Sequence, residues 1–304
     1  MPERYDTAYI AYKGRVEEEL LRLLPEETSI FEDGRIPSLM STSMRYSLLA
    51  GGKRIRPVLM LAVVDMLGGD LEEALPMAAA LEMIHTYSLI HDDLPGMDDD
   101  DMRRGRPTNH KVYGVGQAIL AGDGLLNYAY ECMLKNALEH PEHLTRHVSA
   151  MQIIAERAGV KGMIAGQCID LLSENGTPDL DRLIYIDNHK TADLLTAPLL
   201  AGAALCSLDR ESAEALQAYG QKVGMAFQID DDLLDVEGDA VLLGKATGMD
   251  EKMGKMTWPA ITGIEEARAR AQMLWVEAQN ALSCFGNKAW FLKAFAKKLA
   301  VRRM

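Results

Sequence analysis

Apolar and polar positions alternate along this chain with the period of an α-helix. Between residues 5 and 24, Tyr9, Val16 and Leu20 recur on one face of a helix that ends at Pro25. Two later stretches, 58–67 and 74–90, are apolar on nearly every side, which predicts helices at the centre of the protein. Further helices are expected over residues 38–49, 119–138, 148–172, 181–205, 211–235, 264–283 and 289–301.

Composition supports an all-α fold. Hydrophobic residues make up 48% of the 304 residues, aromatic residues only 6%, and strong helix formers dominate. No linker, low-complexity tract or shift in composition divides the chain, so we expect one domain over residues 1–304.

Charge and cysteine usage exclude several classes of protein. The formal net charge of −13 argues against nucleic-acid binding. The longest uncharged run, 194–208, is 15 residues long and contains Pro198, which predicts a buried helix and no membrane span. The N-terminus lacks the apolar segment of a signal peptide. The four widely spaced cysteines are expected to be buried free thiols in a reducing, cytoplasmic compartment: Cys132, Cys168, Cys206 and Cys284.

Two acidic clusters are the strongest candidates for chemistry. Asp92, Asp93 and Asp98–Asp101 follow the apolar stretch 74–90, and Pro95-Gly96 is expected to break the helix between the two sets of aspartates. About half a chain later, residues 229–235 read IDDDLLD within another apolar helix.

Clustered carboxylates of this kind point to divalent cations. Asp231 and Asp235 are four residues apart and share one helix face, whereas Asp92 and Asp98 need a bulge to come together. Carboxylates repel one another unless cations neutralise them, and Mg²⁺ combines a few carboxylate oxygens with phosphate oxygens. A solvated acidic surface is the alternative, but the apolar flanks of both clusters disfavour it. We therefore expect two acidic helix ends that hold Mg²⁺ around a phosphorylated substrate.

Basic residues supply candidate phosphate ligands. The run GGKRIRP at 51–57 resembles an anion-binding loop that leads into a helix, and a solvated basic turn is an equal alternative. Lys245 and Lys255 follow the second acidic cluster and could bind diphosphate oxygens or be solvated loop lysines.

Taken together, four motifs resemble the trans-isoprenyl diphosphate synthases, with the greatest likeness to farnesyl diphosphate synthases of the bacterial type. They are GGKRIRP, DDLPGMDDDDMRRG, the HKT triplet at 189–191 and FQIDDDLLD, and they cover about residues 40–260. The resemblance implies helices around a large central cavity, a homodimer, about three Mg²⁺ ions, and condensation of isopentenyl diphosphate with an allylic diphosphate.

The resemblance also implies a role for each matching residue. Asp92, Asp98, Asp231 and Asp235 would hold Mg²⁺, supported by Asp93 and Asp232. The allylic diphosphate would be bound by Arg103, Lys190, Lys245 and Lys255. Isopentenyl diphosphate would be bound by Lys53, Arg56, His85 and Arg104. Thr191 and Gln228 would face the allylic carbocation. The departures from the family pattern are the additional acid Asp230, Ala192 in place of a common Gly, and Trp258 in place of a common Tyr.

Product length is the finest inference from this resemblance. In the family, the residues four and five positions before the first aspartate line the cavity floor, and here they are Ser88 and Tyr87. On a helix Tyr87 lies roughly 7–8 Å below Asp92. A bulky aromatic residue there, with the Pro95-Gly96 insertion, resembles enzymes that make the C15 product farnesyl diphosphate. Tyr87 as ordinary core packing is the alternative.

Other functions remain open. The first alternative is a geranylgeranyl or geranyl diphosphate synthase, followed by a non-catalytic partner subunit of such an enzyme. A terpene cyclase or squalene-type synthase would leave GGKRIRP without a role. A prenyl-lipid carrier would release no pyrophosphate.

Overall fold

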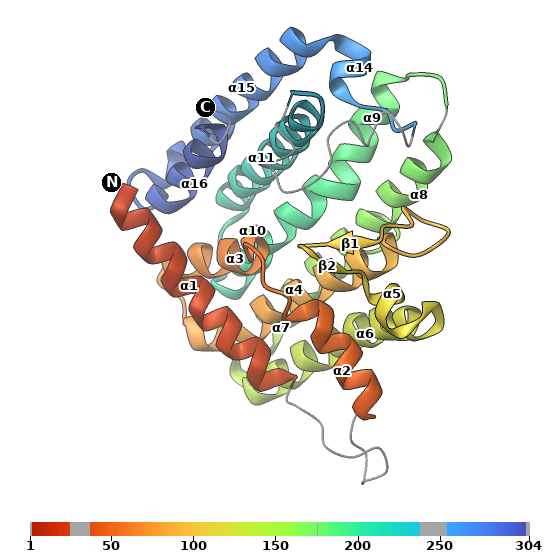
Figure 1. The fold of residues 1–304 in the computed structure, drawn as a ribbon. Coiled ribbons are helices and arrows are strands. Elements are labelled where there is room, and N and C mark those ends of the chain that lie inside the picture. The colour runs from red at the N-terminus through yellow and green to blue at the C-terminus, as the bar shows by residue number, and fades with distance from the viewer. Residues whose placement is uncertain (1, 25–36, 175, 238–253, 302–304) are drawn as a thin grey trace. The chain divides into compact units, whose positions relative to one another are not determined.

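The structure is a computed structural model that describes residues 2–24, 37–174, 176–237 and 254–301 (Figure 1). The fold is all-α, as predicted. The chain forms two compact units, which we call the N-terminal unit (residues 6–151) and the C-terminal unit (residues 152–304 with residues 1–5). Each is described by itself, and the single domain expected over residues 1–304 stays a prediction.

The N-terminal unit is a set of helices with one short β-ribbon. Its helical elements are most of α1 (Pro2–Leu23), then α2 (Ser38–Leu48), α3 (Ile55–Leu67), α4 (Leu71–Asp92), α5 (Asn109–Tyr113), α6 (Val115–Glu139), the short turn η1 (Pro141–His143) and the start of α7 (Leu144–Ala158). Within the described residues, β1 (Met102–Arg103) and β2 (Arg106–Pro107) are the only strands, and they pair antiparallel.

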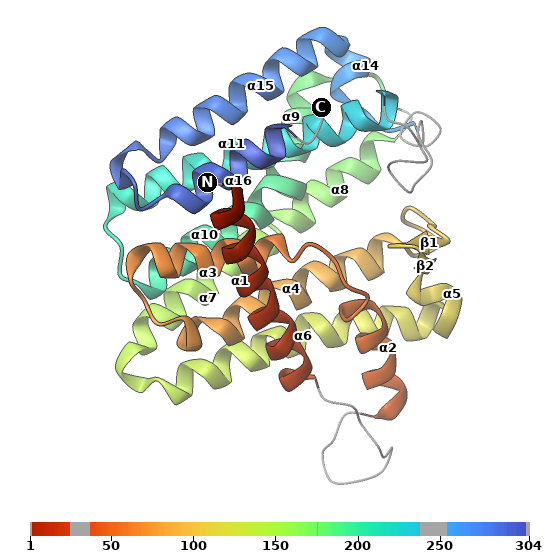
Figure 2. The same ribbon diagram turned by 60° about the vertical axis from the view of Figure 1, so that its left-hand side comes forward.

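Helix α4 lies at the centre of this unit, as its apolar sequence predicts. It packs against α6 on one side and α3 on another (Figure 2). The side chain of Asp70 caps its first turn by accepting a hydrogen bond from the Glu72 amide at 2.8 Å. This cap explains why the helix begins three residues earlier than the expected start at 74. The first acidic motif therefore begins at the end of a buried helix.

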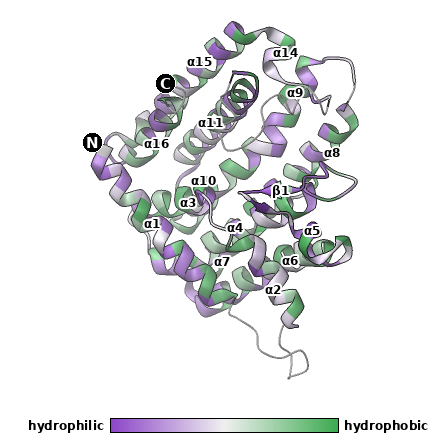
Figure 3. Ribbon diagram, in the orientation of Figure 1, coloured by the Kyte–Doolittle hydropathy of each residue, from purple (hydrophilic) through white to green (hydrophobic). Residues whose placement is uncertain are grey.

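The C-terminal unit contains the second acidic motif. Its elements are the end of α7, then α8 (Met163–Ser173), α9 (Leu180–Ile186), the π-helical turn η2 (Asp187–Ala192), α10 (Asp193–Leu205), α11 (Arg210–Glu237), α14 (Trp258–Thr262), α15 (Ile264–Ala281), the turn η3 (Ser283–Phe285) and α16 (Trp290–Val301). Helix α11 packs between α10 and α15. Figure 3 shows the hydrophobic colouring of α10, whose residues are largely buried.

Two expected helices differ from the structure. The stretch 148–172 divides at residues 159–162, where a Cβ on Gly162 would lie 2.1 Å from the carbonyl oxygen of Arg157. The stretch 181–205 contains the π-helical turn η2, which adds a wider turn to an otherwise continuous helix. The first difference is a local turn of the backbone and the second is a change of helix type, and hydrophobic periodicity reports neither.

The cysteine prediction was partly wrong. All four cysteines are free, as expected, but only Cys132 is buried, while Cys168 and Cys284 are exposed and Cys206 is half-buried. These side chains are small enough to lie on the outer faces of helices and turns without exposing a large apolar surface. No helix in the described ranges combines the length and the apolar character that crossing a membrane requires.

Candidate active site

The first acidic motif forms a tight loop after α4. Asp92 is the last residue of the helix, and its carbonyl oxygen accepts a hydrogen bond from the amide of Asp98 at 2.8 Å. The turn between them passes through Gly96 at φ +143°, a conformation that disfavours residues with a Cβ. The loop thus supplies the bulge that the sequence required, and it brings the backbones of these two aspartates together.

Asp93 is buried and faces Arg103 of strand β1. The Nε of Arg103 donates to Asp93 Oδ1 at 2.6 Å, and its Nη2 donates to Asp100 at 3.3 Å. Burial raises the pKa of Asp93 to about 6, although Arg103 opposes the shift. The β-ribbon therefore holds one motif arginine directly on the acidic loop.

A cluster of basic side chains lies in the same unit, where α3, α4 and the β-ribbon supply Arg56, His85 and Arg104. Burial lowers the pKa of Arg56 to about 10, and burial followed by the charges of Arg56 and Arg104 holds the pKa of His85 well below its usual range. Within the described chain, Arg56 Nε and His85 Nδ1 are buried without hydrogen-bond partners. Such groups are costly unless an anion satisfies them.

The glycine loop before α3 contacts this cluster. Arg104 donates a hydrogen bond to the Gly51 carbonyl, and a Cβ on Gly52 would lie 3.0 Å from the Arg104 guanidinium carbon. Lys53 is exposed, and its carbonyl oxygen accepts a hydrogen bond from Tyr9 at 2.5 Å. The four residues predicted to bind isopentenyl diphosphate thus belong to one unit, and Lys53 is an exposed member of the set.

Arg54 has a different role from its neighbours. Its guanidinium is fully buried and forms ion pairs with Glu17 and Glu82, each at 2.8 Å. It also donates to the carbonyl of Leu48 at 2.8 Å. These contacts fix the start of α3, so this cation of the GGKRIRP run is structural.

A small cavity joins the acidic loop to the basic residues. It measures about 30 Å³, and Asp93, Arg103, Arg104 and Arg106 contribute to its lining with Thr86 of α4. In the part of the chain that the structure describes, the buried hydroxyl of Thr86 has no hydrogen-bond partner. The cavity therefore brings charged groups of the first acidic motif together with side chains of α4.

Tyr87 and Ser88 lie on α4 just below the loop. Tyr87 is 5% exposed and packs edge-to-face on His91, with ring centroids 5.7 Å apart. Burial raises its pKa to about 12, and its hydroxyl has no hydrogen-bond partner among the described residues. The Ser88 hydroxyl donates to the His85 carbonyl at 2.9 Å. Tyr87 is thus the bulkier, buried member of the pair.

In the C-terminal unit, five predicted site residues line one pocket of about 90 Å³. They are Lys190, Thr191, Gln228, Asp232 and Lys255. The pocket combines side chains from η2, from α11 and from the segment before α14. The structure therefore brings together residues that are as much as 65 positions apart in the sequence.

A hydrogen-bond network orders this pocket. The Thr191 hydroxyl donates to Gln228 Oε1 at 3.0 Å, and Gln228 Nε2 donates to Asp232 Oδ1 at 2.9 Å. The other oxygen of Asp232 accepts the Trp258 amide hydrogen at 2.9 Å. The network orients Thr191 and Gln228 through a carboxylate that is itself fixed.

Two glycines allow η2 to pack closely against its neighbours. A Cβ on Gly166 of α8 would lie 2.2 Å from the Lys190 amide nitrogen, and one on Gly224 of α11 would lie 2.4 Å from Ala192 Cα. π-Helical turns occur frequently at functional sites. The close approach of Gly224 also shows how the chain accommodates Ala192.

Two carboxylates of this pocket escaped the sequence reasoning. Asp170 accepts a hydrogen bond from the Lys190 ammonium at 2.5 Å. Asp187 accepts one from the Trp258 indole at 2.6 Å, and burial followed by the charge of Asp232 raises its pKa well above the usual range. Asp187 precedes Lys190 by about one helical turn, and this spacing could have marked it as a neighbour of Lys190 in the sequence. No sequence pattern marks Asp170.

The remaining acids of the second motif differ in burial. Asp235 is buried and Asp231 half-buried, four residues apart on α11. Asp230 accepts a hydrogen bond from the Trp275 indole of α15 at 2.9 Å and does not line the pocket. The additional acid thus belongs to the packing of α11 on α15. Lys245 lies outside the described residues.

Comparison with known proteins gives consistent matches. Residues 37–287 match the family model for polyprenyl synthetase. The chain is 46% identical over 272 residues to geranylgeranyl pyrophosphate synthase 11, chloroplastic, of Arabidopsis thaliana, covering 88% of this chain and 75% of that protein. It is 46% identical over 234 residues to the farnesyl diphosphate synthase of Geobacillus stearothermophilus, covering 77% and 78%.

A solved structure shares the fold. The geranyltransferase from Helicobacter pylori, complexed with magnesium and isoprenyl diphosphate, superposes with a TM-score of 0.79 at 34% identity and 96% coverage of each chain.

Proposed function

The chain belongs to the polyprenyl synthetase family, and we propose that it condenses isopentenyl diphosphate with dimethylallyl or geranyl diphosphate to give farnesyl diphosphate. The observation that carries this proposal is the cluster of basic side chains Arg56, His85 and Arg104, in which Arg56 Nε and His85 Nδ1 are buried without hydrogen-bond partners among the described residues. A second anionic substrate explains that cluster, whereas a cyclase, which takes one diphosphate substrate, would leave it idle.

The two acidic motifs are suited to Mg²⁺. They offer carboxylate oxygens only, from residues that are half-buried or buried at helix ends, which is the donor chemistry that Mg²⁺ prefers. The ligands would be Asp92, Asp98, Asp231 and Asp235. When bound, the ions supply positive charge that neutralises the leaving diphosphate. Because Asp93 and Asp232 are each held by hydrogen bonds, they support the ligands in this assignment.

The chain's own cations complete the binding of the allylic diphosphate. Arg103 and Lys190 are each held by a carboxylate, Asp93 and Asp170 respectively, which limits their motion before substrate arrives. Lys255, at the edge of the C-terminal pocket, is a third candidate, and Lys245 stays a prediction. The allylic C–O bond breaks with its electron pair on the diphosphate, and fixed positive charge stabilises that developing anion.

The ordered pair Thr191 and Gln228 is assigned to the carbocation. Their oxygens are preorganised through Asp232, so they can stabilise positive charge without reorganising during the reaction. Arg56, His85, Arg104 and Lys53 hold isopentenyl diphosphate, whose π electrons form the new carbon–carbon bond. The proton lost in the last step leaves with the released pyrophosphate.

For product length we propose C15, with Tyr87 obstructing the growing chain. Its burial five residues before Asp92, roughly 7–8 Å along α4, supports this assignment. A C20 product is the second candidate, because an Arabidopsis relative at 46% identity is named as a geranylgeranyl synthase. Tyr87→Ala removes the ring, and we expect it to shift the main product from C15 to C20 or longer. Ser88→Ala is the matched control, because it removes one hydroxyl and leaves Tyr87 in place.

The deciding experiment is a product assay. Protein, Mg²⁺ and isopentenyl diphosphate are incubated separately with C5, C10 and C15 allylic primers, and the products are sized by chromatography. We expect C15 from the two shorter primers and no extension of the third. Extension of the C15 primer by the wild type contradicts the Tyr87 assignment but keeps the reaction. No product from any primer contradicts the enzyme proposal and favours a non-catalytic subunit.

A homodimer and a cytoplasmic location stay predictions. The printed name of the Arabidopsis relative places that protein in the chloroplast. Size-exclusion chromatography with light scattering tests the oligomeric state directly.

A further inference from the structure

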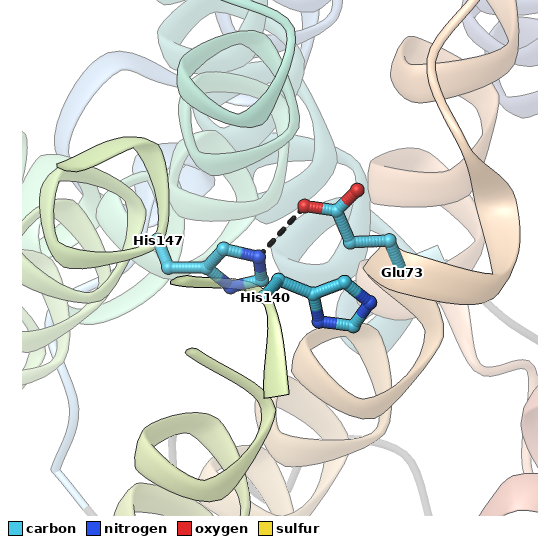
Figure 4. Close-up of side chains that lie close together, drawn as sticks. All are labelled: Glu73, His140 and His147. Atoms are coloured by element: carbon cyan, nitrogen blue, oxygen red, sulfur yellow. Dashed lines mark hydrogen bonds and ion pairs between the residues drawn. The ribbon is translucent and has the colours of Figure 1, made fainter. Parts of the chain in front are cut away.

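A second group of metal-binding side chains lies away from the acidic motifs, within the N-terminal unit. Glu73 of α4, His140 after α6 and His147 of α7 each offer a ligand atom, and these atoms all lie within 4.8 Å of one another (Figure 4). Three of the seven histidines of the chain fall in the run HPEHLTRH at 140–147. Neither the proposed reaction nor the family motifs use these residues.

The group is partly buried, and its side chains contact one another. The side chain of His147 is fully buried, and its Nε2 lies 2.8 Å from Glu73 Oε1. His143 Nδ1 lies 2.9 Å from the same oxygen. The Glu73 carboxylate therefore faces two imidazoles, one of which is fully buried.

Two features distinguish this group from an ordinary hydrogen-bond cluster. His140 Nδ1 lies 2.9 Å from the Asn136 carbonyl oxygen, so Nδ1 carries the proton and Nε2 keeps its lone pair. Metal-binding histidines are oriented by such a bond from the other ring nitrogen. In addition, His147 Nδ1 is buried and lacks a hydrogen-bond partner in the described part of the chain. The His147 ring thus has one nitrogen that faces the Glu73 carboxylate and a second, buried nitrogen without a partner among the described residues.

We propose that Glu73, His140 and His147 bind one zinc-class divalent cation. Two imidazoles and one carboxylate are an established zinc ligand set, with water at the fourth position. Tetrahedral ligands at about 2.1 Å from the metal lie about 3.4 Å apart. The present spacing therefore needs only small side-chain adjustments. His143 lies beside the site and hydrogen-bonds the Glu73 carboxylate.

The position of this site gives it a structural role. Glu73 is the third residue of α4 and Asp92 the last, 19 residues later, so about 28 Å of helix separates the two sites. The three ligands come from the start of α4, the residue after α6 and the first turn of α7. A bound cation ties these three elements together at the end of the unit opposite the acidic loop.

The test uses the full-length protein, stripped with a chelator and then saturated with Mg²⁺ so that the acidic motifs are occupied. Zn²⁺ is titrated calorimetrically, and Co²⁺ serves as a spectroscopic probe of nitrogen coordination. We expect one tight equivalent per chain, a visible Co²⁺ absorption band and a higher unfolding midpoint with Zn²⁺. Absence of binding above the Mg²⁺ background overturns the proposal.

Variants assign the ligands. His147→Gln and His140→Gln are each expected to weaken Zn²⁺ binding by at least about 100-fold, because even the loss of an orienting partner costs 10–100-fold. His140 is only half-buried, so its variant decides the question if His147→Gln fails to fold. The matched control His143→Gln removes an imidazole from the same carboxylate and is expected to keep the stoichiometry of one Zn²⁺ per chain. Asp92→Asn, at the acidic loop, is expected to keep it too. Binding that survives in a folded His140→Gln protein, or that is lost in Asp92→Asn, refutes the site.

Discussion

Replacing Gly166 by Ala adds one methyl group at the point where α8 meets η2. The new Cβ would lie 2.2 Å from the Lys190 amide nitrogen and 2.7 Å from its Cα. Ordinary contact begins at 3.4 Å, so the two backbones must separate by about 1.2 Å. Both atoms belong to the main chain, and a change of rotamer cannot relieve the overlap.

The displacement affects stability and activity differently. Overpacking of this kind lowers the free energy of unfolding by about 1–3 kcal/mol, while the better helix propensity of Ala raises it by about 1 kcal/mol. The turn that moves carries Lys190 and Thr191, and a misplacement of about 1 Å in a catalytic site can cost about 100-fold in rate. We therefore expect a small loss of stability, at most about 2 kcal/mol, together with a roughly 100-fold lower kcat/KM for the allylic substrate.

Urea unfolding and steady-state pyrophosphate release, with isopentenyl and geranyl diphosphates, measure the two quantities. Gly14→Ala is the matched control, because Gly14 is also helical and its Cβ would meet nothing within 4 Å. That variant should keep full activity and gain up to about 1 kcal/mol. If Gly166→Ala keeps a kcat/KM within twofold of the wild type and the same unfolding free energy, the packing argument for η2 is wrong.

Two further predictions concern buried charge. Arg54→Met leaves Glu82 buried without its cation and should lower the unfolding free energy by about 3–5 kcal/mol in urea titrations, whereas adding Glu82→Leu should recover most of that loss. Burial raises the pKa of Asp93 from 3.8 to about 6, so the folded protein binds this proton more tightly than the unfolded chain. In metal-free protein the contribution of Asp93 to stability should therefore increase as the pH falls from about 6 to about 4, and Asp93→Asn should remove this dependence from unfolding midpoints measured across that range. If the unfolding midpoint of the Asp93→Asn variant depends on pH as that of the wild type does, Asp93 is not the group that causes the dependence.

The sequence predicted the helices well where periodicity was clear. The stretch 38–49 corresponds to α2 and 264–283 to α15, within two residues at each end. The helix break at Pro95-Gly96 was also predicted, because neither residue fits a helix interior. These features depend on local sequence, which is why they could be predicted without the fold.

Features that depend on packing were not predicted. The π-helical turn η2 requires the close approach of Gly166 and Gly224, which come from other helices. The pairing of Lys190 with Asp170 joins residues 20 positions apart in different helices, and the structural role of Arg54 depends on Glu17 and Glu82. The candidate ligands belong to motifs that are visible in the sequence, whereas the contacts that support them join residues of different helices and depend on the fold.

Two of the three indoles of the C-terminal unit provide an optical readout of the region around the second acidic motif. Of the three tryptophans in the chain, Trp258 donates its indole hydrogen to Asp187, and Trp275 donates its own to Asp230. Both rings are almost completely shielded from solvent and hydrogen-bonded to these carboxylates, so a change in the charge of either carboxylate is expected to alter the emission of its indole. Intrinsic fluorescence therefore reports changes of charge around α11 without any added label, and substrate or cation binding can be followed in the unmodified protein.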